Sequence, residues 1–189
     1  MKITKEFLKE HNACDYGYEY WIKTDLPDLR EFCLQALKDD YFDFINWLLV
    51  ICLDHKNKIR YAVFAAKKVL NLYESKHPQD LRPRKAIEAA EKVLANDSVE
   101  NRAAADSASD AAADAAAADA VCYAACSAAS YASHATSAYY DITYSASILH
   151  ASCAVIYSVD AYSAYSANPS LKTEIIMYGL SLIYKEDGK

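Results

Sequence analysis

The stretch between Pro83 and Pro169 contains neither glycine nor proline. It is 85 residues long, and from Ala103 to Ala138 it holds 19 alanines in 36 positions. Alanine has the highest helix propensity, whereas glycine and proline are the usual helix breakers. Nearly half of the chain is therefore predicted to be helical, with small side chains that let neighbouring helices approach closely.

Apolar residues also recur at intervals of three and four in the first half of the chain, which is typical of amphipathic helices. We expect one all-α domain over residues 1–189, a multi-helix bundle of about seven helices with an Ala/Tyr-rich C-terminal half. Its parts are an irregular N-terminal arm over 1–25, Leu- and Trp-rich helices over 26–95, Ala-rich helices over 97–168 and a terminal helix over 170–185.

The alanine tract has to fold back on itself, because one unbroken helix of about 70 residues would be about 105 Å long. Its polar positions predict turns near Asp119, near Ser137–Asp141 and near Ser158–Asp160. Alanine buries little area per residue. We therefore expect the sixteen tyrosines to supply bulk to the core, with the larger aliphatic residues concentrated before residue 95.

The net charge of −6 is concentrated in one part of the chain. Residues 1–98 carry 16 basic and 16 acidic side chains, whereas residues 99–170 carry one base and seven acids. General nucleic-acid binding needs Lys and Arg to neutralise phosphates, so the acidic half argues against it. The acids either attract a basic protein partner or simply keep an alanine-rich surface soluble.

We expect neither export nor membrane insertion of this chain. Its first residues are charged and precede no long apolar run, so we expect no signal peptide. The uncharged segments Ala120–Tyr140 and Ile142–Val159 are rich in Ser and Tyr and poor in Leu, Ile and Phe, which argues against a transmembrane helix. With six cysteines and no export signal, we expect a reduced, cytoplasmic protein of a bacterial host cell.

Three cations stand where a helix is predicted to begin: Arg82, Arg84 and Lys85. The helix dipole disfavours positive charge there, so the cluster needs a reason. One reason is an external anion, because free helix N–H groups and two arginines can hold a phosphate or carboxylate. The other is internal pairing, in which Arg82 or Arg84 reaches Asp54, Glu74 or a carboxylate of the alanine tract.

Asp106, Asp110 and Asp114 follow one another at intervals of four and line one helix face. The row is a candidate acidic face for a partner, and its alternatives are a metal site or a solvated surface. Metal sites in helix bundles draw ligands from several helices, often with a Glu-x-x-His motif, and this motif is absent. We expect no metal and no cofactor.

The chain lacks the motifs that usually identify an enzyme. It contains neither a glycine-rich phosphate loop nor a Gly-x-Ser-x-Gly elbow, and it has only three glycines with which to build tight active-site turns. We expect a protein without catalytic residues.

Three strings give the chain a family resemblance. They are Trp47-Leu48-Leu49, Ile59-Arg60-Tyr61-Ala62-Val63-Phe64-Ala65-Ala66 and Asp80-Leu81-Arg82-Pro83-Arg84-Lys85-Ala86-Ile87-Glu88-Ala89-Ala90, followed by the alanine tract. Together they resemble the immunity proteins of the Imm-5 type, an alanine-rich helical family of bacteria and phages, over about residues 41–165. The resemblance implies an all-helical cytoplasmic protein that neutralises a toxin or effector. The Tyr, Ser and Asp content of the tract is closer to the phage members, for which the resemblance implies a host-defence protein as an alternative target.

Three functions remain open at this point. The first is a binding protein that neutralises a toxin, nuclease or host-defence effector, with the acidic face against a basic target. The second is a sponge for a phosphorylated nucleotide signal, in which Arg82, Arg84 and Lys85 hold phosphate and Trp47 stacks on the base, with Arg60 as a further anion- or partner-binding candidate. The third is a structural phage protein that forms homo-oligomers, because alanine-rich faces allow close association.

Overall fold

The computed structural model describes residues 1–115, 120–136, 144–165 and 170–184, which form ten helices and no strand. The all-α class is confirmed. The helices are α1 (Lys5–Glu10), α2 (Asp15–Thr24), α3 (Leu29–Lys38), α4 (Phe42–Cys52), α5 (His55–Lys76), α6 (Arg82–Ala95), α7 (Val99–Ala113), α8 (Ala120–His134), α9 (Tyr144–Tyr165) and α10 (Ser170–Tyr184).

The prediction of about seven helices was wrong, and so was that of an irregular arm over residues 1–25, because this arm contains α1 and α2. Helix α1 has only six residues and is capped by Thr4, whose side chain accepts a hydrogen bond from the backbone N–H of Phe7. Helix α2 has Gly17 at its third position and no side-chain cap bond at its N-terminus. Local propensity therefore disfavours α2, and its packing against the rest of the chain overrides that preference.

The turn predicted near Ser158–Asp160 was also wrong, because α9 continues through these residues. Ser158 is buried, and its hydroxyl donates to the carbonyl oxygen of Ala154 one turn earlier, at 2.7 Å. The hydroxyl of the serine thus finds its acceptor within the helix, and the helix does not end at this residue. The turns predicted near Asp119 and near Ser137–Asp141 lie outside the described residues.

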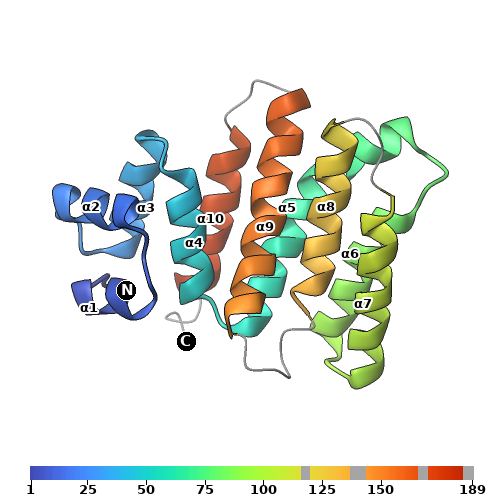
Figure 1. The fold of residues 1–189 in the computed structure, drawn as a ribbon, viewed down its shortest axis with the longest axis horizontal. Helices are drawn as coiled ribbons and strands as arrows, with labels where there is room; N and C mark the ends of the chain where they lie inside the picture. The colour runs from blue at the N-terminus through green and yellow to red at the C-terminus, as the bar shows by residue number, and fades with distance from the viewer. Residues whose placement is uncertain (116–119, 137–143, 166–169, 185–189) are drawn as a thin grey trace.

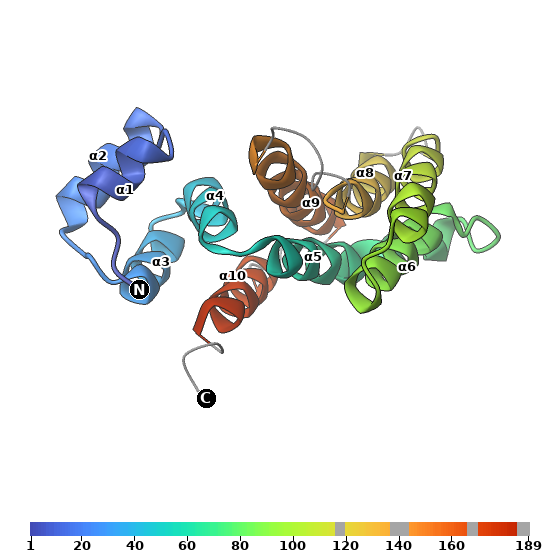
Figure 2. The same cartoon turned by 90° about the horizontal axis from the view of Figure 1, so that it is seen from below.

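Helix α5 lies at the centre of the arrangement and contacts α6, α8, α9 and α10. Seen from below, α8 and α9 lie on one side of α5 and α10 on the other (Figure 2). Helices α1–α3 form one end of the molecule, and the pair α6 and α7 forms the opposite end (Figure 1). The chain therefore presents two distant ends joined by a central layer of long helices.

The core combines large side chains from the first half with alanines from the second. Tyr61 and Tyr73 of α5 are among the largest fully buried side chains. The buried positions of α8 and α9 in the same cluster include Ala128, Ala129, Ala132, Ala151 and Ala154. Tyr131 and Tyr157 of the alanine tract stack on each other at 5.4 Å but are only half-buried. The bulk that fills this part of the core thus comes from α5 as well as from the tract's own tyrosines.

A single buried amide ties α4 to α9. Asn46 is fully buried, and its Nδ2 donates to the carbonyl oxygen and to the hydroxyl oxygen of Ser152, at 3.1 and 2.9 Å. A buried polar group costs free energy unless it is hydrogen-bonded. The pair therefore favours one register between two helices that are 106 residues apart in the chain.

Helix α2 packs directly on the ring of Phe44 at Gly17. A Cβ atom at this position would overlap the ring carbons of Phe44, so only glycine allows the observed approach. Gly17 is buried, and the neighbouring Tyr16 is carried to the surface next to α4. This contact fixes the N-terminal helices against the body of the protein.

Gly17→Ala is expected to lower the free energy of unfolding by about 1–3 kcal/mol through overpacking against Phe44, despite the better helix propensity of alanine. Urea denaturation measures the change. Glu19→Ala is the matched control, because Glu19 is exposed on the same helix and a surface change alters stability by no more than about 0.5 kcal/mol. A Gly17→Ala protein as stable as the control would contradict this account of the α2–α4 contact.

Candidate functional site

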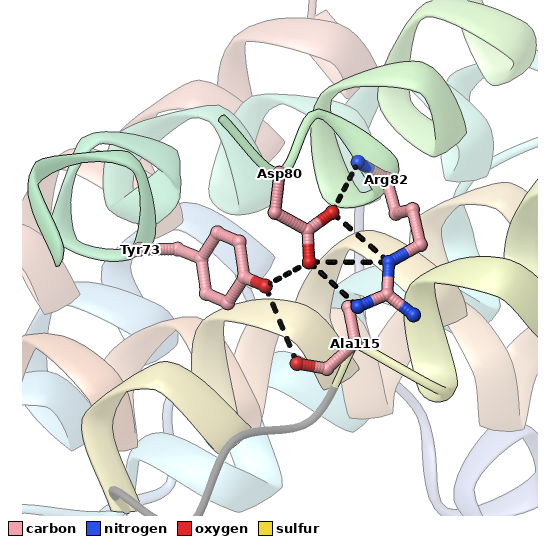
Figure 3. Close-up of polar contacts among 4 residues, drawn as sticks. All are labelled: Tyr73, Asp80, Arg82 and Ala115. Atoms are coloured by element: carbon pink, nitrogen blue, oxygen red, sulfur yellow. Dashed lines mark hydrogen bonds and ion pairs between the residues drawn. The ribbon is translucent and has the colours of Figure 1, made fainter. Parts of the chain in front are cut away.

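Arg82, in the first turn of α6, is held by a carboxylate of its own chain, as Figure 3 shows. Its Nε and Nη2 donate to Asp80 at 2.9 and 2.6 Å, and its backbone N–H donates to the same carboxylate at 3.1 Å. On the other side of the carboxylate, the hydroxyl of Tyr73 donates to Asp80 at 2.6 Å and lies 3.3 Å from the carbonyl oxygen of Ala115. This Asp80 network joins the end of α5, the start of α6 and the chain that follows α7.

The charges in the Asp80 network stabilise one another. The hydrogen bond from Arg82 holds the pKa of the Asp80 carboxyl well below its ordinary value, and the bond from Tyr73 adds to the effect. Burial and the nearby carboxylate raise the pKa of the Tyr73 hydroxyl, so the hydroxyl stays protonated and donates a hydrogen bond to Asp80. Arg82 thus neutralises an internal anion and supports the fold.

The other cations of the predicted anion site do not come together around one common point. Arg84 donates through Nε and Nη2 to the two carboxylate oxygens of Glu74, both at 2.6 Å, while Lys85 is exposed. Arg60 donates to Asn57 at 2.7 Å and precedes Glu74 by 14 residues on α5, which corresponds to about 21 Å of helical rise. Arg82 and Arg84 are therefore both paired with carboxylates of their own chain. Glu74 is one of the partners that we expected from the sequence.

The predicted acidic face presents fewer carboxylates than its spacing suggests. Asp106 is half-buried, with one carboxylate oxygen covered and without a hydrogen-bond partner, whereas Asp110 and Asp114 are exposed. Asp114 is the C-cap of α7. Among the residues that the structure describes, no group of three or more His, Cys, Asp or Glu side chains could hold a metal ion.

A pocket of about 420 Å³ lies where three segments meet: the start of α2, the start of α4 with the residues before it, and the start of α10. Its walls are largely aromatic, with Tyr16 stacked on Tyr41 at 4.7 Å and Phe44 stacked on Trp47 at 5.4 Å. Tyr16 is 64% exposed, so this wall is open to a ligand from solvent. We call this site the aromatic pocket. Its volume lies in the range of about 300–1,000 Å³ that is usual for ligand sites.

The charged residues of the aromatic pocket are two carboxylates and one cation. Asp40 and Asp43 are both exposed, and the Nζ of Lys172 lies 2.8 Å from Asp40 Oδ1 and 5.4 Å from the centre of the Phe42 ring. Asp160 of α9 lies close by: burial raises the pKa of its carboxyl, and the charge of Asp43 raises it further. The pocket is therefore net negative.

Of the predicted site residues, Trp47 is the one that lines the aromatic pocket. The pocket residues that the sequence analysis did not single out include Tyr16, Asp40, Tyr41, Asp43 and Lys172. The alternation of acidic and aromatic residues in Asp40-Tyr41-Phe42-Asp43-Phe44 could have indicated a binding surface. No pattern could have brought Lys172 to it, because this residue lies 132 positions after its partner Asp40.

No protein-family model matches the chain, and no curated protein and no solved structure matches it either. The resemblance to the immunity proteins of the Imm-5 type thus stays a prediction. None of the described helices has both the length and the apolar character needed to cross a membrane.

Asp80→Ala is expected to lower the free energy of unfolding by about 1–3 kcal/mol, because it leaves the buried hydroxyl of Tyr73 without its strongest acceptor. The measurement is urea denaturation followed by circular dichroism. Glu74→Ala is the control, since it removes the carboxylate of the neighbouring pair with Arg84, which is about equally exposed, but not the acceptor of the Tyr73 hydroxyl, and it is therefore expected to cost less. Equal losses in both variants would show that the Tyr73 contact adds nothing.

The low pKa of Asp80 also predicts a pH dependence. The folded-state pKa lies below the unfolded value of about 3.9, so the carboxylate stabilises the fold above the unfolded pKa, and this contribution is lost as the pH falls from there through the folded-state pKa. The wild type is expected to be more stable than Asp80→Asn at neutral pH and to lose this advantage progressively as the pH falls below about 4. A difference that stays constant across this range would exclude the ionised Asp80 network.

Proposed function

We propose that the chain is a non-enzymatic binding protein that neutralises a basic toxin, nuclease or host-defence effector by covering part of its surface. The observation that carries the proposal is the aromatic pocket. Tyr and Trp are enriched among the residues that dominate binding energy in protein interfaces. Here Tyr16, Tyr41 and Trp47 line a concave site whose charged residues, Asp40, Asp43 and Lys172, leave it net negative. Such a site suits a positively charged partner.

The charge distribution supports the same reading. The excess of acids between residues 99 and 170 accounts for the whole net charge of −6. Helix α7, with Asp110 and its C-cap Asp114, lies at the opposite end of the molecule from α2 (Figure 1), and Tyr16 of α2 lines the pocket. These carboxylates therefore act on a basic target through the field that steers its approach, and the pocket makes the contact.

The neutralising role itself comes from the resemblance to the Imm-5-type proteins. The nucleotide sponge has weaker support, because Arg82 and Arg84 already hold the carboxylates of Asp80 and Glu74. An external phosphate would have to displace both. The oligomeric structural role remains an alternative that a molecular-mass measurement in solution can test.

Purified basic toxin nucleases, assayed for activity with and without the chain, test the proposal. We expect one of them to be inhibited at stoichiometric amounts, with weaker inhibition as salt is raised. Trp47→Ala should weaken the binding by at least about tenfold, which is about 1.4 kcal/mol. Val99→Ala is the control, because Val99 is 67% exposed on α7, away from the pocket. Inhibition that a folded Trp47→Ala protein retains in full, or a panel without any inhibited nuclease, would contradict the proposal.

A further inference from the structure

Lys172 shows that the aromatic pocket accommodates a cation. Its Nζ lies between a carboxylate and an aromatic face, 2.8 Å from Asp40 Oδ1 and 5.4 Å from the centre of the Phe42 ring. The side chain of Lys172 is 33% exposed and that of Asp40 is 82% exposed, so the lysine side chain is covered more than its counter-ion. A positive charge in this position gains from both the ion pair and the ring quadrupole.

The pocket keeps more negative charge than Lys172 can neutralise. Asp43 is exposed at the pocket, and Asp160 lies near enough for the two carboxylates to repel each other. The pKa of Asp160 is raised by burial and then by Asp43, whereas Lys172 lowers it. A second cation beside Asp43 would relieve this like-charge repulsion.

The aromatic walls favour a flat cation over a compact one. Tyr16 with Tyr41, and Phe44 with Trp47, form two stacked pairs that line the pocket. A guanidinium group is planar and weakly hydrated, stacks on aromatic rings and presents a fork of N–H donors that matches a carboxylate. An ammonium group is compact and strongly hydrated, so it gains less from such walls.

We propose that the aromatic pocket receives the guanidinium group of an arginine side chain of the protein target, and that Lys172 competes with it for Asp40. The inference rests on the proposed function, since it names the group by which the basic target is recognised. The arginine stacks beside Trp47 and donates to Asp43. Lys172 limits its affinity, because it repels the incoming charge and occupies the second carboxylate.

Titration with N-acetyl-arginine amide, followed by NMR, tests the site without the target. N-acetyl-citrulline amide is the matched ligand, because it has nearly the same shape and no charge. We expect the arginine compound to bind at least about tenfold more tightly than the citrulline compound, which lacks the charge-assisted bonds. The corresponding lysine amide should bind more weakly than the arginine amide, since its ammonium group cannot stack on a ring or donate two parallel hydrogen bonds to one carboxylate.

Three variants separate the roles of the charges. Asp43→Asn should weaken binding of the arginine amide by about fivefold or more, through loss of the charge-assisted bond. Lys172→Met should tighten it by about threefold or more, through loss of the like charge. Glu88→Gln, which removes an exposed carboxylate on α6, at the end of the molecule opposite α2 (Figure 1), should leave it unchanged. Thermal melts of each variant check that the fold is retained.

Equal binding of the arginine and citrulline compounds would overturn the guanidinium site. Unchanged or weaker binding to a folded Lys172→Met protein would overturn the competition by Lys172. Inhibition of a target that persists when the arginine amide fails to bind would overturn this inference and leave the proposed function standing. Binding of the amide with no inhibited target would overturn the protein partner and assign the pocket to a free guanidinium compound.

Discussion

The close packing of alanine-lined helices against α5 is the constraint on which the rest of the structure depends. Ala128 and Ala132 of α8 and Ala154 of α9 are buried in the same core as Tyr61 and Tyr73 of α5. Small side chains on one side allow the approach, and large ones on the other fill the remaining space at normal packing density. With α10 on the opposite side of α5, this arrangement fixes where the ends of the long helices lie (Figure 2).

The aromatic pocket is a consequence of that arrangement. Asn46 holds α4 to α9 through Ser152, and Lys172 of α10 reaches Asp40 just before α4. Gly17 then lets α2 approach Phe44, which carries Tyr16 onto Tyr41. The site is thus assembled from three segments that are distant in the chain, and each is held by a contact with its own physical cause. Such pre-formed sites bind with less loss of conformational entropy than flexible surfaces do.

The start of α6 shows how a promising charge pattern becomes a structural feature. Arg82 and Arg84 stand at a helix N-terminus, where external anions are often bound. In this fold the end of α5 and the connection after it bring Glu74 and Asp80 to the two guanidinium groups. The nearby carboxylates compete with any ligand from solution because they are already in place, and Tyr73 strengthens one of them through a buried hydroxyl. The positive cluster therefore serves the connection between α5 and α6.

Periodicity and propensity were sufficient for the all-α class, since the predicted helical segment over 26–95 contains α3 to α6 and the predicted terminal helix over 170–185 coincides with α10. These signals are local, and long helices carry many of them. The short helix α1 was missed because six residues show little periodicity. Helix α2 was missed because Gly17, a residue type that usually breaks helices, lies near its start. Ser158 was mistaken for a turn because its hydrogen bond to Ala154 within the helix has no signature in the sequence.

Trp47 is the one residue of the candidate site that was predicted from the sequence. The amino-acid sequence by itself determined that this protein is helical, that its second half packs through small side chains and that its acids are concentrated there. Only the tertiary structure decided that the arginines of α6 are neutralised internally and that Lys172 faces Asp40 beside a set of aromatic rings. The physical reason is that these contacts join residues up to 132 positions apart, and such distances are set by the packing of whole helices around α5.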